Sequence, residues 1–296
     1  MIVAVTGASG VIGGAVCKYL ETAGHTIVRI SRNLTFADVH WSPSEGVIDH
    51  KGLDGIDAVI HLAGESIGGR RWTLKQKTEI YESRINGTKL ITRAVTSLDA
   101  PPKVFLSGSA IGFYGDCGSD KVDETFSRGG GFLADVAADW EKSTKAAEEA
   151  GIRVVHLRTG IVLDPTSGVL QKMLPLFRLG VGGKLGTGNQ YWSWITLEDQ
   201  VRLISWLLSN SIEGPVNLSA PNPITNTEFT KTLGQVLGRP TVMSVPRFGP
   251  EILIGKEFAR ELIFTSTRAI PSIALSHGFE FAYPHLDVAL NGILEK

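Results

Sequence analysis

Three glycines spaced three residues apart, Gly7, Gly10 and Gly13, stand near the start of the chain. The apolar run 2–6 before them is typical of a buried strand, and the apolar residues after them recur at helical spacing. In a dinucleotide-binding turn, such glycines give a tight turn, close approach of a pyrophosphate and close helix-on-strand packing. A plain strand-to-helix turn is the alternative. A second expected strand at 26–31 completes a βαβ unit and favours the dinucleotide site.

Arg32 follows that second strand, in the sequence Ser31-Arg32-Asn33. Folds that bind NAD usually have Asp or Glu there, which bonds the ribose 2′-hydroxyl. A guanidinium can instead pair with a 2′-phosphate, and no carboxylate stands there to repel it. The alternative for a lone arginine is a solvated surface side chain. The position favours a cofactor role, so the sequence predicts NADP(H).

Two further motifs follow expected strands: His61-Leu62-Ala63-Gly64 after 57–62, and the loop 107–115 after 104–107. With the glycine turn, they resemble the extended short-chain dehydrogenase/reductases. Other segments resemble an atypical branch of that family, often labelled nucleoside-diphosphate-sugar epimerases: 62–65, Arg71-Trp72, Ser83-Arg84, Trp140-Glu141, 157–160, 173–180 and 186–190. The resemblance extends over essentially the whole chain.

The glycine turn and the resemblance together predict a cofactor site. Its expected residues are Gly7, Ser9, Gly10, Val11, Ile12, Gly13, Ser31, Arg32, Leu62, Ala63, Gly64, Glu65, Arg84, Ser107, Thr159 and Gly160. Glu65 follows the turn that borders the cofactor. A carboxylate there beside Arg84 is more typical of a structural ion pair than of a catalytic group.

The resemblance implies catalysis by an asparagine, a serine or threonine, and a Tyr-x-x-x-Lys pair whose lysine lowers the tyrosine pKa. No tyrosine of this chain has lysine four residues later, and Arg84 stands where the family has asparagine. Ser109, in the register of the catalytic serine, and Tyr114 remain as catalytic candidates facing the nicotinamide. The alternative is that Ser109 bonds loop backbone and Tyr114 packs the loop. Without a cationic neighbour, Tyr114 would be a poor base at pH 7.

Aromatic and basic residues gather between 177 and 194 and could hold a substrate, including a nucleotide base and phosphates. Such residues more often serve packing, so only Arg178 and Gln190 are substrate candidates. The family pattern has histidine in a Trp-Ile-His segment where this chain has Thr196, so a role carried by that histidine is not expected here.

Strands alternate with helices expected at 75–98, 133–150, 169–177 and 197–209, which predicts an α/β fold with a doubly wound parallel Rossmann sheet. A further helix is expected from Thr225, where Thr225-x-x-Glu228 forms a capping box. We expect an NADP-binding domain at 1–163, completed by about 189–220. A smaller C-terminal substrate lobe is expected at 164–188 and 221–296.

Composition narrows the function classes. The 296 residues are 43% hydrophobic, and 29 Lys and Arg nearly balance 30 Asp and Glu, which argues against nucleic-acid or anionic-membrane partners. Cys17 and Cys117 form no CxxC motif, and the histidines show no metal-ligand spacing, so neither a disulfide framework nor a metal site is expected. No leader or membrane span is recognisable, which makes the cytoplasm the default location.

These observations predict an NADP(H)-dependent oxidoreductase or epimerase-like enzyme that lacks the Tyr-x-x-x-Lys pair. Its substrate would be a small carbonyl, alcohol or sugar nucleotide. The alternative is a catalytically weak or inactive NADPH-binding sensor or interaction protein. Extended short-chain enzymes commonly dimerise through the two helices expected here at 75–98 and 133–150. Charged residues cover the outer faces of both helices, so we expect a monomer or a weak homodimer.

Overall fold

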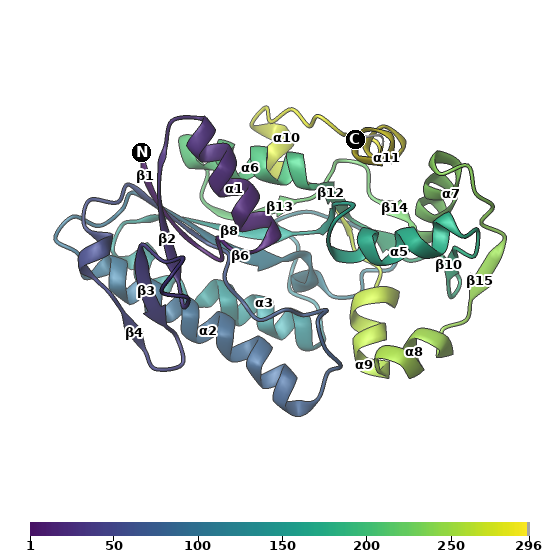
Figure 1. Ribbon diagram of the computed structural model, residues 1–296, viewed down its shortest axis with the longest axis horizontal. Helices are drawn as coiled ribbons and strands as arrows, with labels where there is room; N and C mark the ends of the chain where they lie inside the picture. Colours follow the sequence, from purple (N-terminus) through teal and green to yellow (C-terminus); the bar gives the residue numbers. More distant parts are fainter. Residues whose placement is uncertain (295–296) are drawn as a thin grey trace.

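The computed structural model describes residues 1–294 and is built around one eight-stranded sheet (Figure 1). In spatial order its strands are β13 (Gly214–Leu218), β8 (Arg153–Thr159), β6 (Val104–Ala110), β5 (Ala58–His61), β1 (Ile2–Thr6), β2 (Thr26–Ser31), β3 (Val39–Ser42) and β4 (Val47–Ile48). Neighbouring strands are parallel except in the β3–β4 pair. The predicted α/β fold class is therefore confirmed.

Helices cover both faces of this sheet. One face carries α1 (Val11–Thr22) and α6 (Leu197–Ser209), and the other carries α2 (Leu74–Thr96), α3 (Phe132–Lys142) and α4 (Lys145–Glu149). In β1, Val3 and Val5 pack with α1, whereas Ala4 packs with α2. All three side chains are fully buried. β1 reads as an apolar run because both of its faces are covered.

The helix expected over 133–150 is divided into α3 and α4. At the division, the Ser143 hydroxyl donates to the Asp139 carbonyl (2.7 Å) and the Thr144 hydroxyl donates to the Glu141 carbonyl (2.8 Å). Such side-chain bonds to backbone carbonyls compete with helix continuation. The helical spacing of the apolar residues continues across the break, which is why the sequence predicted one helix.

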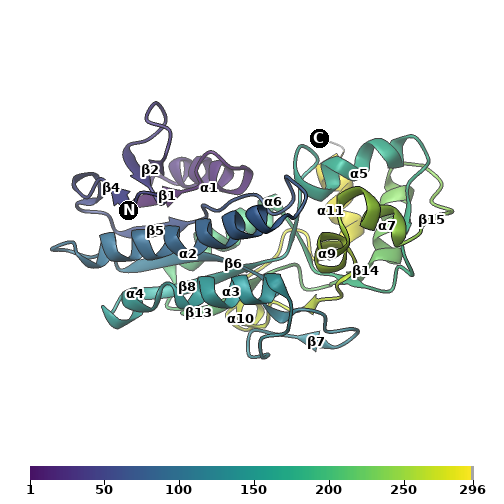
Figure 2. The same cartoon turned by 90° about the horizontal axis from the view of Figure 1, so that it is seen from below.

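A smaller lobe lies beyond one end of the sheet, as Figure 2 shows from below. Its core joins α5 (Gly168–Arg178), α7 (Asn226–Val236) and α11 (Leu286–Leu294). The capping box expected at Thr225 is present, with Glu228 as its partner. Residues 268–281, expected within this lobe, return to the main sheet, where Ala274 and Phe279 join the core beneath α1 and α6.

Short elements connect the lobe to the sheet. Four two-stranded pairs form: β9 (Ile161–Leu163) with β12 (Trp194–Thr196), β10 (Gly183–Leu185) with β15 (Met243–Val245), β11 (Tyr191–Trp192) with β14 (Ile224–Thr225), and β7 (Lys121–Val122) with β16 (Arg268–Ala269). The short helices are η1 (Lys51–Leu53), η2 (Ile111–Tyr114), α8 (Phe248–Ile254), α9 (Lys256–Ala259), the π-turn η3 (Arg260–Phe264) and α10 (Ser272–Ser276). Within residues 1–294, no helix is both long and apolar enough to cross a membrane.

Candidate functional site

The glycine turn between β1 and α1 requires its glycines. Gly7 has a φ of 72°, and a Cβ at Gly13 would lie 2.2 Å from the Gly7 carbonyl oxygen. A Cβ at Gly7 would lie 2.9 Å from the carbonyl carbon of Leu62. Larger residues would therefore push the turn away from α1 and from the loop after β5.

The N-terminus of α1 is open to a ligand. Among the described residues, no side chain caps this helix, and its first turn contains no acidic residue. Its unpaired amides carry partial positive charge and can bind an anion such as a pyrophosphate. The residues present therefore fit the phosphates of a dinucleotide.

Two cavities meet at this turn and share Gly7, Gly10 and Leu62. The first, which we call the Arg32 cavity, has a volume of about 830 Å³. It includes the predicted residues Gly7, Ser9, Gly10, Ser31, Arg32, Leu62, Ala63, Gly64 and Glu65. The second, the Ser109 cavity, has a volume of about 610 Å³ and includes the predicted residues Gly7, Gly10, Val11, Ile12, Gly13, Leu62, Arg84, Ser109, Thr159 and Gly160.

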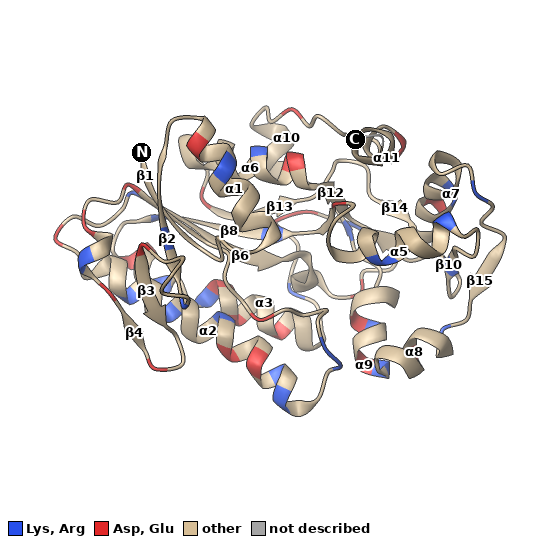
Figure 3. Cartoon of the chain, in the orientation of Figure 1, with Lys and Arg blue, Asp and Glu red and all other residues tan. Residues whose placement is uncertain are grey.

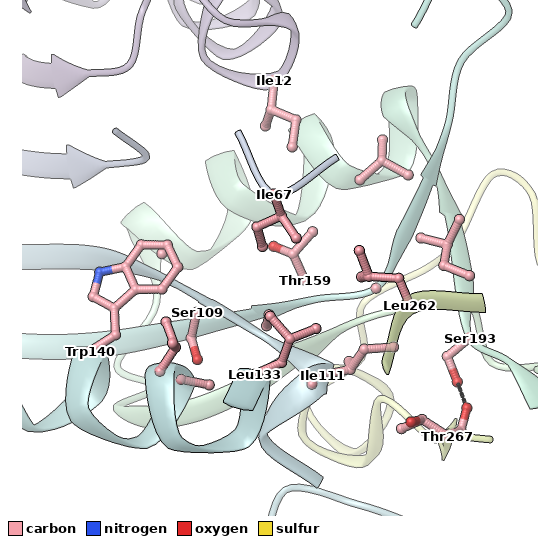
Figure 4. A pocket seen from close by; sticks show the side chains of 18 of the residues that line it. Ile12, Ile67, Ser109, Ile111, Leu133, Trp140, Thr159, Ser193, Leu262 and Thr267 are labelled. Atoms are coloured by element: carbon pink, nitrogen blue, oxygen red, sulfur yellow. Dashed lines mark hydrogen bonds between the residues drawn. The ribbon is translucent and has the colours of Figure 1, made fainter. Parts of the chain in front are cut away.

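Ser109 lies on β6 at the wall of the Ser109 cavity (Figure 4). Its hydroxyl donates to a Glu141 carboxylate oxygen at 2.6 Å rather than to loop backbone. Arg158 on β8 donates to both oxygens of that carboxylate, from Nε at 2.8 Å and from a terminal nitrogen at 2.9 Å. Both charged side chains are nearly buried. Ser109 therefore has a fixed acceptor for its proton, and its lone pairs remain for a ligand.

Tyr114 lies behind this wall, and its side chain is 1% exposed. Its hydroxyl donates to Asn217 (2.7 Å) and accepts from Arg158 (2.9 Å). Arg158 is therefore a cationic neighbour of Tyr114. Burial nevertheless outweighs that charge and raises the pKa of Tyr114 to about 12. Tyr114 is thus a protonated partner of Arg158, and it is not among the described residues that line the Ser109 cavity.

Arg84 on α2 lies between the two cavities, next to Gly64. Its guanidinium donates to the backbone carbonyls of Glu65 (2.9 Å) and Ile80 (3.1 Å), and it lies over the Trp140 ring at 5.0 Å. The expected pairing was with the Glu65 carboxylate, which instead accepts from Gln76. Burial lowers the pKa of Arg84 to about 10.

Three other predicted residues lie away from both cavities. Ser107 is fully buried in β6, and its hydroxyl donates to the Gly108 carbonyl. Arg178 is exposed on α5. The Gln190 amide donates to the carbonyls of Leu185 and Ile263. Arg178 and Gln190, the expected substrate residues, therefore do not line the Ser109 cavity.

His61 ends β5 beneath the glycine turn and is completely buried. Thr6 Oγ1 accepts from the amides of Leu62 and Ala63, so its own proton goes to His61 Nδ1 (2.7 Å). His61 Nε2 then donates to Thr88 (3.0 Å). Burial lowers the pKa of His61 to about 3, so the neutral ring ties the loop after β5 to α2.

Glu261 of η3 connects the C-terminal segment to the start of α3. Its two carboxylate oxygens accept from the amides of Phe132 and Leu133, each at 2.8 Å. Glu261, Leu262, Thr265 and Thr267 all line the Ser109 cavity. Sequence reasoning missed these residues because no motif marks them. It also missed Trp41, Pro43 and Ser44, which line the Arg32 cavity from β3 and the turn after it.

Known protein families and relatives match most of the length of this chain. Residues 3–219 match the NAD dependent epimerase/dehydratase family, and residues 245–293 match a domain of unknown function, DUF1731. The epimerase family protein Mb2239 of Mycobacterium bovis is 41% identical over 292 residues, covering 98% of this chain and 96% of that protein.

Two solved structures extend the comparison. Human epimerase family protein SDR39U1 (isoform 2), crystallised with NADPH, superposes with a TM-score of 0.92 at 30% identity and covers 100% of this chain and 99% of that chain. The nucleoside-diphosphate sugar epimerase from Corynebacterium glutamicum has a TM-score of 0.80 at 32% identity, covering 99% of this chain and 58% of that chain.

Proposed function

This chain belongs to the NAD-dependent epimerase/dehydratase family, as its motifs predicted, and from that premise we propose that it binds NADP(H) and acts as an oxidoreductase or epimerase-like enzyme. Its substrate would be a small molecule with a carbonyl or alcohol group. The human relative crystallised with NADPH supports this choice of cofactor.

One observation carries the proposal: two cavities meet at the open N-terminus of α1. A dinucleotide consists of two nucleoside halves joined by a pyrophosphate, and this arrangement offers a place for each part. The adenosine half and its 2′-phosphate would lie in the Arg32 cavity, and the nicotinamide half would lie in the Ser109 cavity beside Thr159 and Gly160. NADP(H), when bound, would accept or supply the hydride.

Ser109 and Glu141 would handle the proton. A substrate hydroxyl that donates to Ser109 Oγ can pass its proton to that oxygen while the serine passes its own proton to Glu141. In the reverse direction, the same two transfers protonate the substrate oxygen. Arg158 would hold the carboxylate in place, and Tyr114 would hold Arg158. This serine–carboxylate chain would replace the missing Tyr-x-x-x-Lys pair.

The C-terminal segment would form the substrate side of the site. We propose that residues 164–188 and much of 221–296 act as the substrate lobe, while 1–163, with about 189–220, act as the cofactor domain. Leu262, Thr265 and Thr267 on the wall of the Ser109 cavity support this division.

A catalytically weak or inactive NADPH sensor is the second candidate. Burial raises the pKa of Tyr114 to about 12, so Tyr114 does not take the place of the tyrosine that exchanges the proton in the family. This favours the second candidate. The proton path through Ser109 and Glu141 favours an enzyme.

Arg32→Asp tests the cofactor proposal. The exposed guanidinium would pair with the 2′-phosphate, so the unchanged protein should bind NADPH at least tenfold more tightly than NADH, and the variant should reverse this preference. Calorimetric titration with both cofactors measures it. Arg93→Asp, at an exposed arginine on α2, is the matched control and should leave both affinities unchanged. Tighter NADH than NADPH binding by the unchanged protein would contradict the proposal.

A further inference from the structure

We propose that the substrate is an uncharged, mainly apolar carbonyl compound or its alcohol, and not a nucleoside-diphosphate sugar. This inference rests on the proposed function and concerns the part of the Ser109 cavity that the cofactor would leave free. The inference follows from the charged residues around that space.

Apolar side chains form most of its wall. Figure 4 shows Ile111, Leu133 and Leu262 converging on the space, with Ile67 across from them. Among the described residues that line the cavity, only Arg84 and Glu261 are charged. Buried phosphates need cations or several amides as partners, because an unpaired charge loses its hydration.

Arg84 is poorly placed to supply that positive charge. One nitrogen of its guanidinium donates to two backbone carbonyls, and the group lies over Trp140. It also touches Gly64, which lines the Arg32 cavity. Arg84 is therefore held between the two cavities by contacts with the protein itself.

The N-terminus of α3 could otherwise bind an anion at this cavity, but Glu261 already occupies it. The carboxylate accepts from two amides of the first turn, at Phe132 and Leu133. An anionic substrate would have to displace this carboxylate and would also be repelled by it. The site thus opposes negative charge where a helix terminus would normally favour it.

The groove outside the cavity gives a diphosphate no better place. It shares Glu261 and Thr265 with the Ser109 cavity, and it is lined by Arg247 and Arg260 but also by Asp116, Glu251 and Glu261. The three carboxylates outnumber the two guanidinium groups. Arg178, the other cation expected to hold phosphates, is exposed on α5.

Two hydroxyls of the wall already have partners within the protein. The Ser193 hydroxyl donates to the Thr267 carbonyl (2.8 Å), and the Thr267 hydroxyl donates to the Gly115 carbonyl (2.9 Å). Ser109 Oγ keeps its lone pairs and lies against the apolar wall. The geometry suits one oxygen on Ser109 and a hydrocarbon or aromatic body against Ile111, Leu133 and Leu262.

Two probes of the same shape test this inference. 4′-Methylacetophenone and 4-acetylbenzoate are identical except that the first has a methyl group where the second has a carboxylate. An aliphatic ketone, 2-decanone, and a nucleoside-diphosphate sugar, UDP-glucose, are tested beside them. The protein is first loaded with NADP⁺, which cannot reduce a ketone, and each probe is then titrated by calorimetry. We expect at least one uncharged ketone to bind and UDP-glucose to show no binding. We also expect 4′-methylacetophenone to bind at least tenfold more tightly than 4-acetylbenzoate.

Leu262→Arg should remove or reverse the preference between the two matched probes, because it places a cation on the wall. Ile67→Arg gives a second test from the opposite side, should the first variant not fold. Leu253→Arg is the matched control, since Leu253 is 78% exposed on α8, and it should change nothing.

The inference is overturned if UDP-glucose or 4-acetylbenzoate binds as tightly as the uncharged ketones, if no uncharged ketone binds, or if both wall variants fold and keep the original preference. Failure to bind NADP⁺ would instead overturn the proposed function, so the two failures are distinguishable.

Discussion

At the residue scale, the buried ion pair of Glu141 and Arg158 decides what Ser109 can do. A serine alone is a weak proton carrier, but one that donates to a fixed carboxylate can accept a proton and pass on its own. Glu141 is 32 positions from Ser109 in the sequence. This hydrogen bond depends on how α3 packs against β6, so the sequence offered Ser109 as a candidate but gave no signal for Glu141 as its partner.

Ser109→Ala and Glu141→Gln should each lower turnover about 100-fold, a typical loss for an acid–base group, while NADPH affinity stays nearly unchanged. Glu141→Gln should also lower the free energy of unfolding by about 3 kcal/mol, because Arg158 is left buried without its carboxylate. Steady-state kinetics with a ketone that binds, calorimetry and denaturant unfolding measure these effects. Glu148→Gln, at an exposed glutamate of α4, is the matched control. Wild-type turnover in both variants would exclude the proton path.

His61 should make the protein sensitive to acid. The pKa of His61 is lowered to about 3 in the folded chain, against about 6.5 when unfolded. Between these values the unfolded state binds more protons, so stability is complete above about pH 6.5 and falls as the pH decreases toward 3. The slope from this one group reaches about 1.4 kcal/mol per pH unit.

Urea unfolding at several pH values between 6.5 and 4.5 measures that slope. His61→Gln should lower stability at pH 7 but flatten the slope. His277→Gln, at an exposed histidine, should leave the slope as it is. An unchanged slope in His61→Gln would show that His61 does not carry the acid sensitivity.

At the element scale, local sequence signals predicted helices better than they predicted their breaks and contacts. The capping box at Thr225 and the whole of α6 were predicted because caps and apolar periodicity lie within a few residues. The break between α3 and α4 depends on hydroxyl bonds to backbone carbonyls that periodicity does not show. The direction of Tyr114 depends on η2, which turns its ring toward Arg158 and Asn217.

The contact between η3 and α3 should stabilise the packing of the C-terminal segment against α3. Glu261→Ala removes a cap from the two first-turn amides of α3 and should lower the free energy of unfolding by about 1 kcal/mol. Thermal and denaturant unfolding measure the loss. Glu280→Ala, at an exposed glutamate outside this contact, is the control. Equal stability of the two variants would show that the cap contributes nothing.

At the scale of the whole molecule, the sequence predicted the doubly wound sheet and the glycine turn between β1 and α1, because strand, glycine and helix signals are adjacent along the chain. It did not predict the wall of the Ser109 cavity. That wall combines residues from η2, α3, β11 and η3, which lie far apart in sequence. Leu262 and Glu261 in particular carry no motif, so only the folded chain shows that they line the same cavity as Ser109.

The outer faces of α2 and α3 determine whether the protein can dimerise through these two helices. Figure 3 shows Lys, Arg, Asp and Glu interspersed along α2. Exposed charged residues cover both helices and the adjoining α4: Lys75, Glu82, Lys89, Arg93, Asp135, Lys142, Lys145 and Glu149. Some form surface ion pairs within one helix, such as Lys145 with Glu149.

A dimer that packed these faces into a four-helix bundle would have to bury those charges. Imperfectly paired buried charges cost several kcal/mol, whereas a bundle needs an apolar stripe. We therefore expect a monomer, or a weak dimer that uses another surface, in light scattering at micromolar concentration. The double variant Arg93→Glu with Lys142→Glu should leave the measured mass unchanged. A stable dimer that dissociates in this variant would mean that salt bridges between subunits outweigh the cost of burial, and the prediction would be wrong.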